Sequence, residues 1–342
     1  MKSETRARLN DPRLLQVREA HFARLEDLFA NRFLSQAFVL QGIVGQSDVD
    51  AYADPEGWVD AALDDLAGRA DAALDSKVFR PLVLECNPYV VHFVDRMFGL
   101  HVYMNERHWW SECLLTSMGA LRPPDLDKDD TWRLAQRIAK AFLDLEVTVP
   151  LFGLPTIASP LNILVNLYGE AALAAMIEQP PVVHHDLRVI NDLLCGLHHW
   201  YREHIPAAQL QPVVAAGRCQ PRGFGQICGC TTHLLSAGMY RDYIAALDDE
   251  LLSVYDHGGM IHLCGVHRQH IPVWREMRSL RAVQLNDRAA EDLETYFHEL
   301  RDDQVIYLNS TATMTVERGM EITDGRRLVI VADVKDPPVR AR

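Results

Sequence analysis

The sequence predicts an α/β fold, namely a (β/α)8 TIM barrel with an N-terminal helical extension, and three observations favour it. Short apolar segments alternate with helix-like segments from residue 80 onward, which is typical of a parallel sheet covered by helices. About seven or eight such strands can be counted, which suits a closed barrel better than an open sheet. The chain has 342 residues, enough for one barrel with insertions. An open sheet is the alternative, because the two folds differ mainly in strand number.

Helical periodicity dominates the chain before the first expected strand. Apolar residues in segment 14–34 recur at helix spacing. A second helix is expected from Asp54, which can cap it, with Pro55 in its first turn. We therefore expect residues 1–78 to form an N-terminal helical cap or lid and residues 79–342 to form the barrel. The residues that select the substrate are expected in this cap.

The remaining elements follow in alternation. Helices are expected at 131–146, 159–177 with Ser159 as cap, 184–205, and 236–258 with Ser236 as cap and Gly258 as stop. Strands are expected at 81–85, 147–153, 224–230, 260–265, 280–287, 305–310 and 326–334. In a barrel the carboxyl ends of all strands meet at one face, which is where catalytic sites form.

Composition excludes several classes of function. The formal net charge of −13 disfavours binding to nucleic acid or to an anionic membrane. The chain has no apolar run long enough for a transmembrane helix, and its polar N-terminus lacks the apolar core of a signal peptide. Seven cysteines, an odd number, indicate reduced thiols rather than a disulfide scaffold. We therefore expect a cytoplasmic protein.

Two cysteine-containing pairs carry the chemistry. His262 and Cys264 are two residues apart in one expected strand, so their side chains project to the same face. Cys228 and Cys230 have the same spacing in the preceding strand. A right-handed crossover makes these two strands parallel and adjacent, so both pairs are expected at the barrel mouth. Thiolates with an imidazole suit zinc above other common metals.

The ligand number decides what such a site does. Three ligands leave one position open for a substrate, whereas all four close the site and make it structural. The alternative is a buried histidine beside buried thiols, because free cysteine is among the most buried residue types. A redox CxC motif is a weaker third interpretation, because the spacing is not CxxC at a helix start.

Longer stretches around these residues resemble the uroporphyrinogen decarboxylase superfamily. The run LLSAGMYRDYIAALDDELLSVYDHGGMIHLCG is similar to the family segment that ends in its His-x-Cys motif. SPLNILVNLYGEAALAAMIEQPP and CNPYVVHFVDRMFG are similar to two earlier family segments. The resemblance covers roughly residues 80 to 335. It implies a TIM barrel with an N-terminal helical extension.

The superfamily contains porphyrinogen decarboxylases and zinc-dependent methyltransferases that move methyl groups between corrinoid proteins and thiols. The decarboxylases carry an arginine-rich N-terminal motif for a substrate with many carboxylates. The nearest basic stretch here, TRARLNDPR, lacks its order. The chain therefore looks closer to the methyltransferase branch.

The zinc ligands of that branch are a His-x-Cys pair and a later cysteine. His262 and Cys264 match the pair, but the last expected strand has no cysteine and offers only Asp333. Cys228 or Cys230 supplies the missing thiolate, or Asp333 supplies an oxygen, or no catalytic zinc binds. We favour a cysteine of the 228/230 pair, with Cys230 as the third ligand, because thiolate matches the softness of the site.

The expected function is methyl transfer between a corrinoid, or a methylated small molecule, and a zinc-activated thiol. Its alternatives are a decarboxylase or lyase acting on a carboxylated tetrapyrrole or a smaller acid, and a non-catalytic barrel that binds a tetrapyrrole or corrinoid. The expected partners are a small-molecule substrate and a corrinoid protein that carries the methyl group. The resemblance also implies a homodimer.

Other side chains at expected strand ends complete the candidate site. Glu85 ends the first expected strand, and Asn286 and Asp287 end the strand at 280–287, so we expect catalytic roles for these three. Asn309 and Trp109 are candidates for binding substrate. Each has an ordinary structural alternative, because Asn and Asp favour turns and tryptophan favours buried packing.

Overall fold

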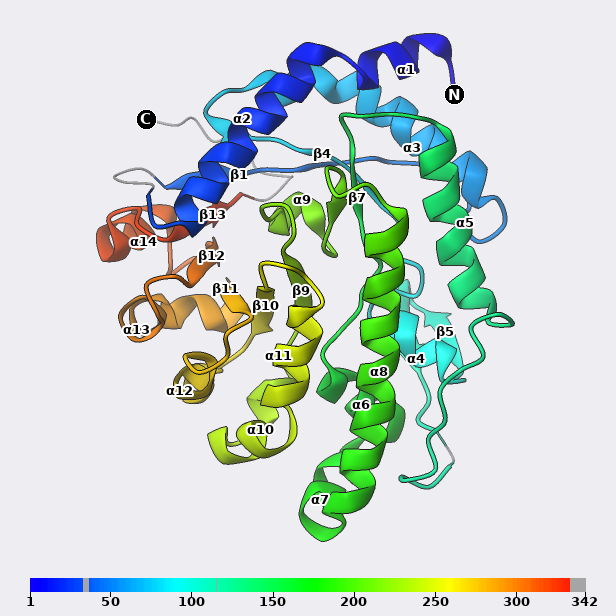
Figure 1. Ribbon diagram of the computed structural model, residues 1–342, viewed down its shortest axis with the longest axis vertical. Coiled ribbons are helices and arrows are strands. Elements are labelled where there is room, and N and C mark those ends of the chain that lie inside the picture. The colour runs from blue at the N-terminus through cyan, green and yellow to red at the C-terminus, as the bar shows by residue number, and fades with distance from the viewer. Residues whose placement is uncertain (33–36, 115, 333–342) are drawn as a thin grey trace.

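The computed structural model describes residues 1–32, 37–114 and 116–332. Helices and strands alternate along the chain, and the long strands are parallel to their neighbours (Figure 1). The predicted α/β class is therefore confirmed. Asp333 lies outside the described residues.

The strands form two parallel sheets and one hairpin. The larger sheet has the order β3-β1-β13-β12-β11-β10-β9, and the smaller has the order β2-β4-β7-β8. The bounds in the larger sheet are β1 Phe38–Leu40, β3 Val78–Phe79, β9 Gly225–Cys228, β10 Gly259–Cys264, β11 Leu280–Asn286, β12 Val305–Asn309 and β13 Leu328–Val331. Those in the smaller are β2 Ile43–Val44, β4 Leu82–Glu85, β7 Leu151–Gly153 and β8 Leu210–Gln211. The antiparallel hairpin is β5 Val102–Asn105 and β6 His108–Ser111.

The two sheets are joined by continuous strands along one side and by one bridge along the other. The chain runs directly from β1 into β2 and from β3 into β4, and Gln41 N donates to Phe79 O between them at 2.9 Å. On the other side, a single parallel bridge joins Ala158, beyond β7, to Cys228 of β9. The hydrogen-bonded sheet is therefore unclosed, and the closed barrel that the sequence predicts is not confirmed.

Most of the helices lie on the outside of the sheets (Figure 1), whereas α2 and α9 pack against the inner apolar cluster. The bounds of the helices are α1 Ser3–Leu9, α2 Pro12–Phe29, α3 Pro55–Arg69, α4 Phe93–Met97, α5 Asp130–Asp144, α6 Pro160–Tyr168, α7 Glu170–Glu178, α8 Pro180–His204, α9 Ala215–Arg218, α10 Ala237–Tyr243, α11 Ala245–Ser253, α12 Ile271–Trp274, α13 Leu293–Glu299 and α14 Val316–Thr323. Short 3₁₀ segments are η1 Ala70–Leu74, η2 Val90–His92, η3 Cys230–Leu234, η4 Arg268–His270 and η5 Asp287–Asp292.

Three residues are expected to cap helices through their side chains, and two of them, Asp54 and Ser236, do so. Asp54 accepts from Gly57 N at 2.9 Å, and Ser236 accepts from Met239 N at 3.2 Å. Ser159 occupies the N-cap position of α6, but its hydroxyl donates to the buried Asp248 instead. The prediction of a single helix over residues 159–177 is also wrong. Gly169 adopts a φ of +64° and divides it into α6 and α7, which bend by 107°.

No single helix in the described parts of the chain is long and apolar enough to cross a membrane. The bent pair α6 and α7 meets the criterion jointly, by length and composition only.

The observed strands differ from the expected outline at β1, β2 and β7. The first strands, β1 and β2, occur well before residue 80, where only helices are expected, because three and two residues are too short to show strand periodicity. The strand expected at 147–153 is limited to β7, because Val149 N donates to Leu9 O outside the sheet.

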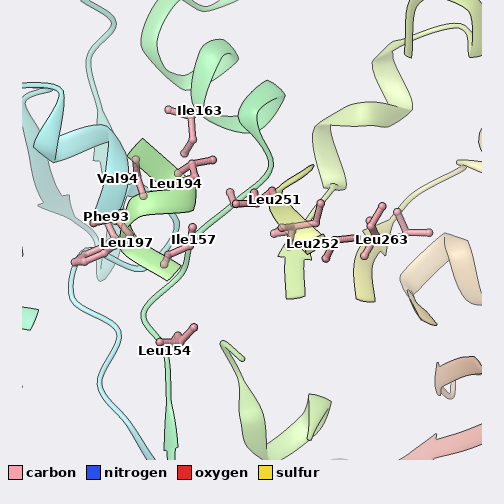
Figure 2. Close-up of a cluster of buried hydrophobic side chains, with 14 of the residues drawn as sticks. Phe93, Val94, Leu154, Ile157, Ile163, Leu194, Leu197, Leu251, Leu252 and Leu263 are labelled. Atoms are coloured by element: carbon pink, nitrogen blue, oxygen red, sulfur yellow. The ribbon is translucent and has the colours of Figure 1, made fainter. Parts of the chain in front are cut away.

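Two apolar layers hold the fold together. The outer layer lies between the sheets and the helices, and Figure 2 shows part of it, with side chains from α4, α6, α8, α11 and β10 meeting. The labelled residues are Phe93, Val94, Leu154, Ile157, Ile163, Leu194, Leu197, Leu251, Leu252 and Leu263. The inner layer lies on the opposite face of the larger sheet, where strand residues such as Met260, Ala282 and Val305 meet α2.

Helix α2 covers the amino ends of the strands. Phe22 packs on Phe79 at a ring distance of 5.3 Å, and Phe29 packs on Phe224, the residue before β9, at 4.7 Å. Arg281, near the start of β11, donates to Phe29 O at 3.3 Å. Helix α2 therefore closes the end opposite the strand carboxyl termini and does not form a lid over them.

Candidate functional site

The candidate site lies where β9, β10 and β11 end. His262 in β10 is directly opposite Cys228 in β9 and Gln284 in β11, because the three strands pair in parallel register. Two residues later Cys264 is opposite Asn286. Parallel pairing therefore brings polar side chains from three strands into neighbouring rows at one edge of the sheet.

Cys228, Cys230 and His262 form a compact group of donor atoms. Their two sulfurs and an imidazole nitrogen all lie within 4.8 Å of one another. The sulfurs of Cys228 and Cys230 are 3.5 Å apart, and the Cys264 sulfur is 3.0 Å from His262 Nε2. The four side chains that the sequence selects as metal ligands therefore do come together.

Cys230 is positioned by a turn and not, as expected, by the strand that carries Cys228. We expect it on the same strand face as Cys228, but β9 ends at Cys228 and Cys230 begins the 3₁₀ segment η3. Gly229 ends the strand, with a φ of −102° and a ψ of 20°. The resulting turn folds the second thiol back beside the first.

A hydrogen-bond chain fixes the orientation of His262. Its Nδ1 lies 2.8 Å from Gln284 Oε1, and Gln284 Nε2 donates to Asn309 Oδ1 at 2.7 Å. Because an amide oxygen only accepts, the ring carries its proton on Nδ1 and leaves Nε2 with a free lone pair toward the thiols. This is the arrangement that metal-binding histidines use, with a neighbouring group that fixes the tautomer.

Three amides outside the expected ligand set hold the site. Gln284 orients His262, Asn286 Nδ2 lies 3.6 Å from the Cys264 sulfur, and Asn162 Nδ2 lies 3.8 Å from the Cys228 sulfur. Asn162 also accepts from Thr231 N, which ties α6 to the turn that carries Cys230. Gln284 was identifiable in the sequence, since it is two residues before Asn286 on the same strand face. Asn162 gave no signal, because it lies on a helix with ordinary periodicity.

Hydrogen bonding among the three cysteines separates their acidities. It lowers the pKa of Cys228 and of Cys264 below that of an ordinary thiol and raises the pKa of Cys230 above it. Arg218 lies close enough for its positive charge to act on all three cysteines. Its Nη1 donates to Gln226 at 2.6 Å, with the amide oriented so that Gln226 also donates to Val213 O.

This donor set fits a zinc ion. Two or three thiolates and one neutral imidazole are the ligands of tetrahedral zinc sites, and the orientation of His262 by Gln284 supplies the usual outer partner. Asp333, the oxygen ligand considered from the sequence, lies outside the described residues. Within those residues, Cys228 and Cys230 supply the thiols that complete the group begun by His262.

A cavity of about 420 Å³ lies beside Asn286, whose Nδ2 is 3.6 Å from the Cys264 sulfur, although no cysteine is among its ten lining residues. Three of the residues selected from the sequence line it: Glu85, Asn286 and Asn309. Ser310 is its fourth polar residue, and the other six are small or apolar. Glu85 Oε1 accepts from Ala216 N at 2.7 Å, and burial raises the pKa of this carboxyl group. The volume is in the range of small-molecule sites.

The structure does not bring the other two candidates into this cavity. Asp287 is exposed just beyond β11, with a φ of +47°, and accepts from Asn286 Nδ2 at 3.1 Å. Trp109 lies on the hairpin strand β6, where its ring packs 5.1 Å from Tyr89 and 6.0 Å from Tyr52. Neither residue belongs to the ten that line the cavity.

Comparison with known proteins extends the description of the fold. The chain matches no protein-family model and no curated protein. Among solved structures it is similar to a methyltransferase from Methanosarcina mazei, with a TM-score of 0.59 and 12% sequence identity. The match covers 92% of this chain and 93% of that chain. At this identity the likeness establishes a common fold over nearly the whole length of both proteins.

Proposed function

We propose that this protein is a zinc-dependent methyltransferase that transfers a methyl group to the sulfur of a small thiol. One observation carries the proposal: the thiol and imidazole donors of Cys228, Cys230 and His262 lie together at strand ends. A cavity of ligand size reaches the neighbouring Asn286, whose Nδ2 is 3.6 Å from the Cys264 sulfur. The common fold with a methyltransferase supports the proposal. The resemblance of the HLC segment to zinc-dependent methyltransferases supports the same reading.

The residues of the site have separate roles in this proposal. Cys228, Cys230 and His262 would hold the ion and leave one position open for the acceptor, and Gln284 orients the His262 ring by accepting from its Nδ1. A bound zinc ion lowers the pKa of a thiol, so the acceptor is nucleophilic at neutral pH without a general base. In the transfer, a sulfur–carbon bond forms as the bond between the methyl carbon and its donor breaks. The donor keeps the electron pair, and the thiol proton passes to water.

Several finer expectations belong to this proposal. A corrinoid carried by a partner protein is the proposed methyl donor, because methylated corrinoids give up their methyl group to a thiolate. A fully closed (β/α)8 barrel also stays a prediction. So does the division of the chain into a helical cap, residues 1–78, and a barrel, residues 79–342. A substrate with many carboxylates is a poor match, because the ten residues that line the cavity include no lysine, arginine or histidine.

Metal analysis of the full chain, purified without chelators, tests the proposal. We expect about one zinc per chain, lost in both Cys230→Ser and His262→Ala because each removes a donor. Cys113→Ser is the matched control, because Cys113 is an exposed thiol outside the donor group. Circular dichroism of each variant separates loss of zinc from loss of fold.

Two further readouts decide the reaction. The wild-type protein, mixed with methylcobalamin and a small thiol, should form the S-methyl product, and Cys230→Ser should not. Folded wild-type protein that contains no zinc would contradict the proposed function. Zinc that survives in both donor variants would show that it binds elsewhere.

A further inference from the structure

The cavity beside Asn286 has one charged lining residue, Glu85. The cavity extends from Asn286, whose Nδ2 is 3.6 Å from the Cys264 sulfur, to Glu85 at the end of β4. One carboxylate oxygen of Glu85 accepts from Ala216 N. Asn309 and Ser310 add neutral polar groups to the lining. A ligand whose sulfur reaches the cysteines therefore places its other end near a carboxylate.

The charged groups around the cavity show what that end must carry. Glu85 is the one charged side chain among the ten lining residues. Arg218, whose positive charge acts on both Glu85 and the cysteines, is not among those ten. A half-buried carboxylate is stabilised when a cation pairs with it, so the cavity favours a cationic ligand group beside Glu85. An anionic group in the same place would face like-charge repulsion with no lining cation to offset it.

We propose that the methyl acceptor is an aminothiol whose ammonium group pairs with Glu85 while its sulfur reaches the cysteine and histidine group. This inference rests on the proposed function, since it assigns the substrate class of that same site. It also assigns Glu85 a role: the carboxylate selects the acceptor by charge. The six small or apolar lining residues suit a short carbon chain between the two ends.

Thiol binding to cobalt-substituted protein tests this assignment without any turnover. Cobalt(II) replaces zinc in thiolate sites, and a thiol that joins the metal changes the visible absorption. Three thiols of similar length are titrated at pH 7: cysteamine with an ammonium end, 2-mercaptoethanol with a neutral end, and 3-mercaptopropionate with a carboxylate end. We expect cysteamine to bind about tenfold more tightly than 2-mercaptoethanol, and 3-mercaptopropionate to bind weakest.

The variant Glu85→Gln removes the charge and keeps the shape. Because the three thiols differ in their own acidity, the informative quantity is the ratio of their affinities in wild type and in this variant. We expect the preference for cysteamine to fall to about twofold or less. Glu85→Asp keeps the charge on a shorter side chain, and we expect it to retain the order of the three thiols.

The outcomes separate this inference from the proposed function. If 3-mercaptopropionate binds as tightly as cysteamine, or if Glu85→Gln leaves the ratios unchanged, the aminothiol assignment is wrong while thiol binding stands. If no thiol alters the cobalt spectrum, the proposed function fails and the assignment fails with it.

Discussion

The two ends of the larger sheet are built from the same strand faces but from opposite kinds of side chain. At the amino end of β10 the inward residue is Met260, whereas two and four residues later the inward residues are His262 and Cys264. Neighbouring β11 repeats the change, from Ala282 to Gln284 and Asn286. Each strand therefore passes from a packed apolar end to a polar end within a few residues.

This difference separates stability from chemistry. The amino end is closed by α2 and contributes buried apolar surface, which is the main source of folding free energy. The carboxyl end holds thiols, amides and a carboxylate around a cavity, groups that stabilise a fold poorly but bind ligands. Substitutions at the two ends should therefore have different consequences.

The largest expected effect is on stability, from the amino end. Phe22→Ala removes a ring that is 1% exposed and packs on Phe79, so the free energy of unfolding should fall by about 3–5 kcal/mol. Denaturant unfolding measures this change. Gln16→Ala, at an exposed position of α2, is the control and should stay within about 0.5 kcal/mol.

The same variant also tests the separation itself. Folded Phe22→Ala protein should still bind the wild-type amount of zinc, because the donor group is at the other end of the strands. Loss of zinc from folded Phe22→Ala protein would show that the two ends are coupled, and the contrast between them would fail.

The second prediction concerns a buried acid near the carboxyl end. Asp248 accepts from Ser159 and Tyr240, and burial raises the pKa of its carboxyl group to about 7. Between about pH 4 and pH 7 the folded protein keeps this proton while the unfolded chain releases it, so stability falls as pH rises through this window. Above pH 7 the loss is complete, at roughly 4 kcal/mol.

Asp248→Asn removes this titration. Relative to wild type, the variant should gain roughly 4 kcal/mol in unfolding free energy between pH 4 and pH 8, as measured by urea unfolding at both values. A constant difference between the two proteins across this range would mean that Asp248 is ionised throughout and that its burial has no such cost.

The third prediction tests the orientation of His262. Gln284→Leu deletes the acceptor for His262 Nδ1–H, so zinc affinity should fall about 10- to 100-fold while the fold is kept. Gln284→Glu retains an acceptor oxygen and should bind zinc within about tenfold of wild type. Competition with a chromophoric chelator measures both. Equal affinities for Gln284→Leu and wild type would show that the hydrogen bond is irrelevant to the metal.

Much of this site was predictable because it depends on strand periodicity. Alternation in the MIHLC segment places His262 and Cys264 on one face, and the same rule in AVQLN places Gln284 and Asn286 together. Strand adjacency after a single helical crossover correctly brings Cys228 next to His262. Strand periodicity and the succession of strands along the chain are both visible in the sequence, so this part of the site could be predicted.

The remaining features depend on contacts that no local pattern encodes. Cys230 reaches the site through a turn at Gly229, and Asn162 reaches it from a helix 66 residues before Cys228. Strands β1 and β2 exist because β13 and β4 pair with them, and alone they are too short to be recognised. The position of α2 at the amino end follows from Phe22 and Phe29, which look like any helical core residues.

The smallest expected effect comes from Trp109, which the sequence selects for substrate binding and the structure places on the β5–β6 hairpin. Its ring packs with Tyr52 and Tyr89 and does not line the cavity, so Trp109→Ala should change thiol affinity in the cobalt titration less than about twofold. Stability should fall by about 1 kcal/mol, because a half-buried aromatic contact is lost. Trp110→Ala, which removes a ring that is 52% exposed, is the matched control. A tenfold loss of thiol affinity in Trp109→Ala alone would mean that the hairpin closes over the cavity when ligand binds, and the polar end would then extend beyond the strands that form it.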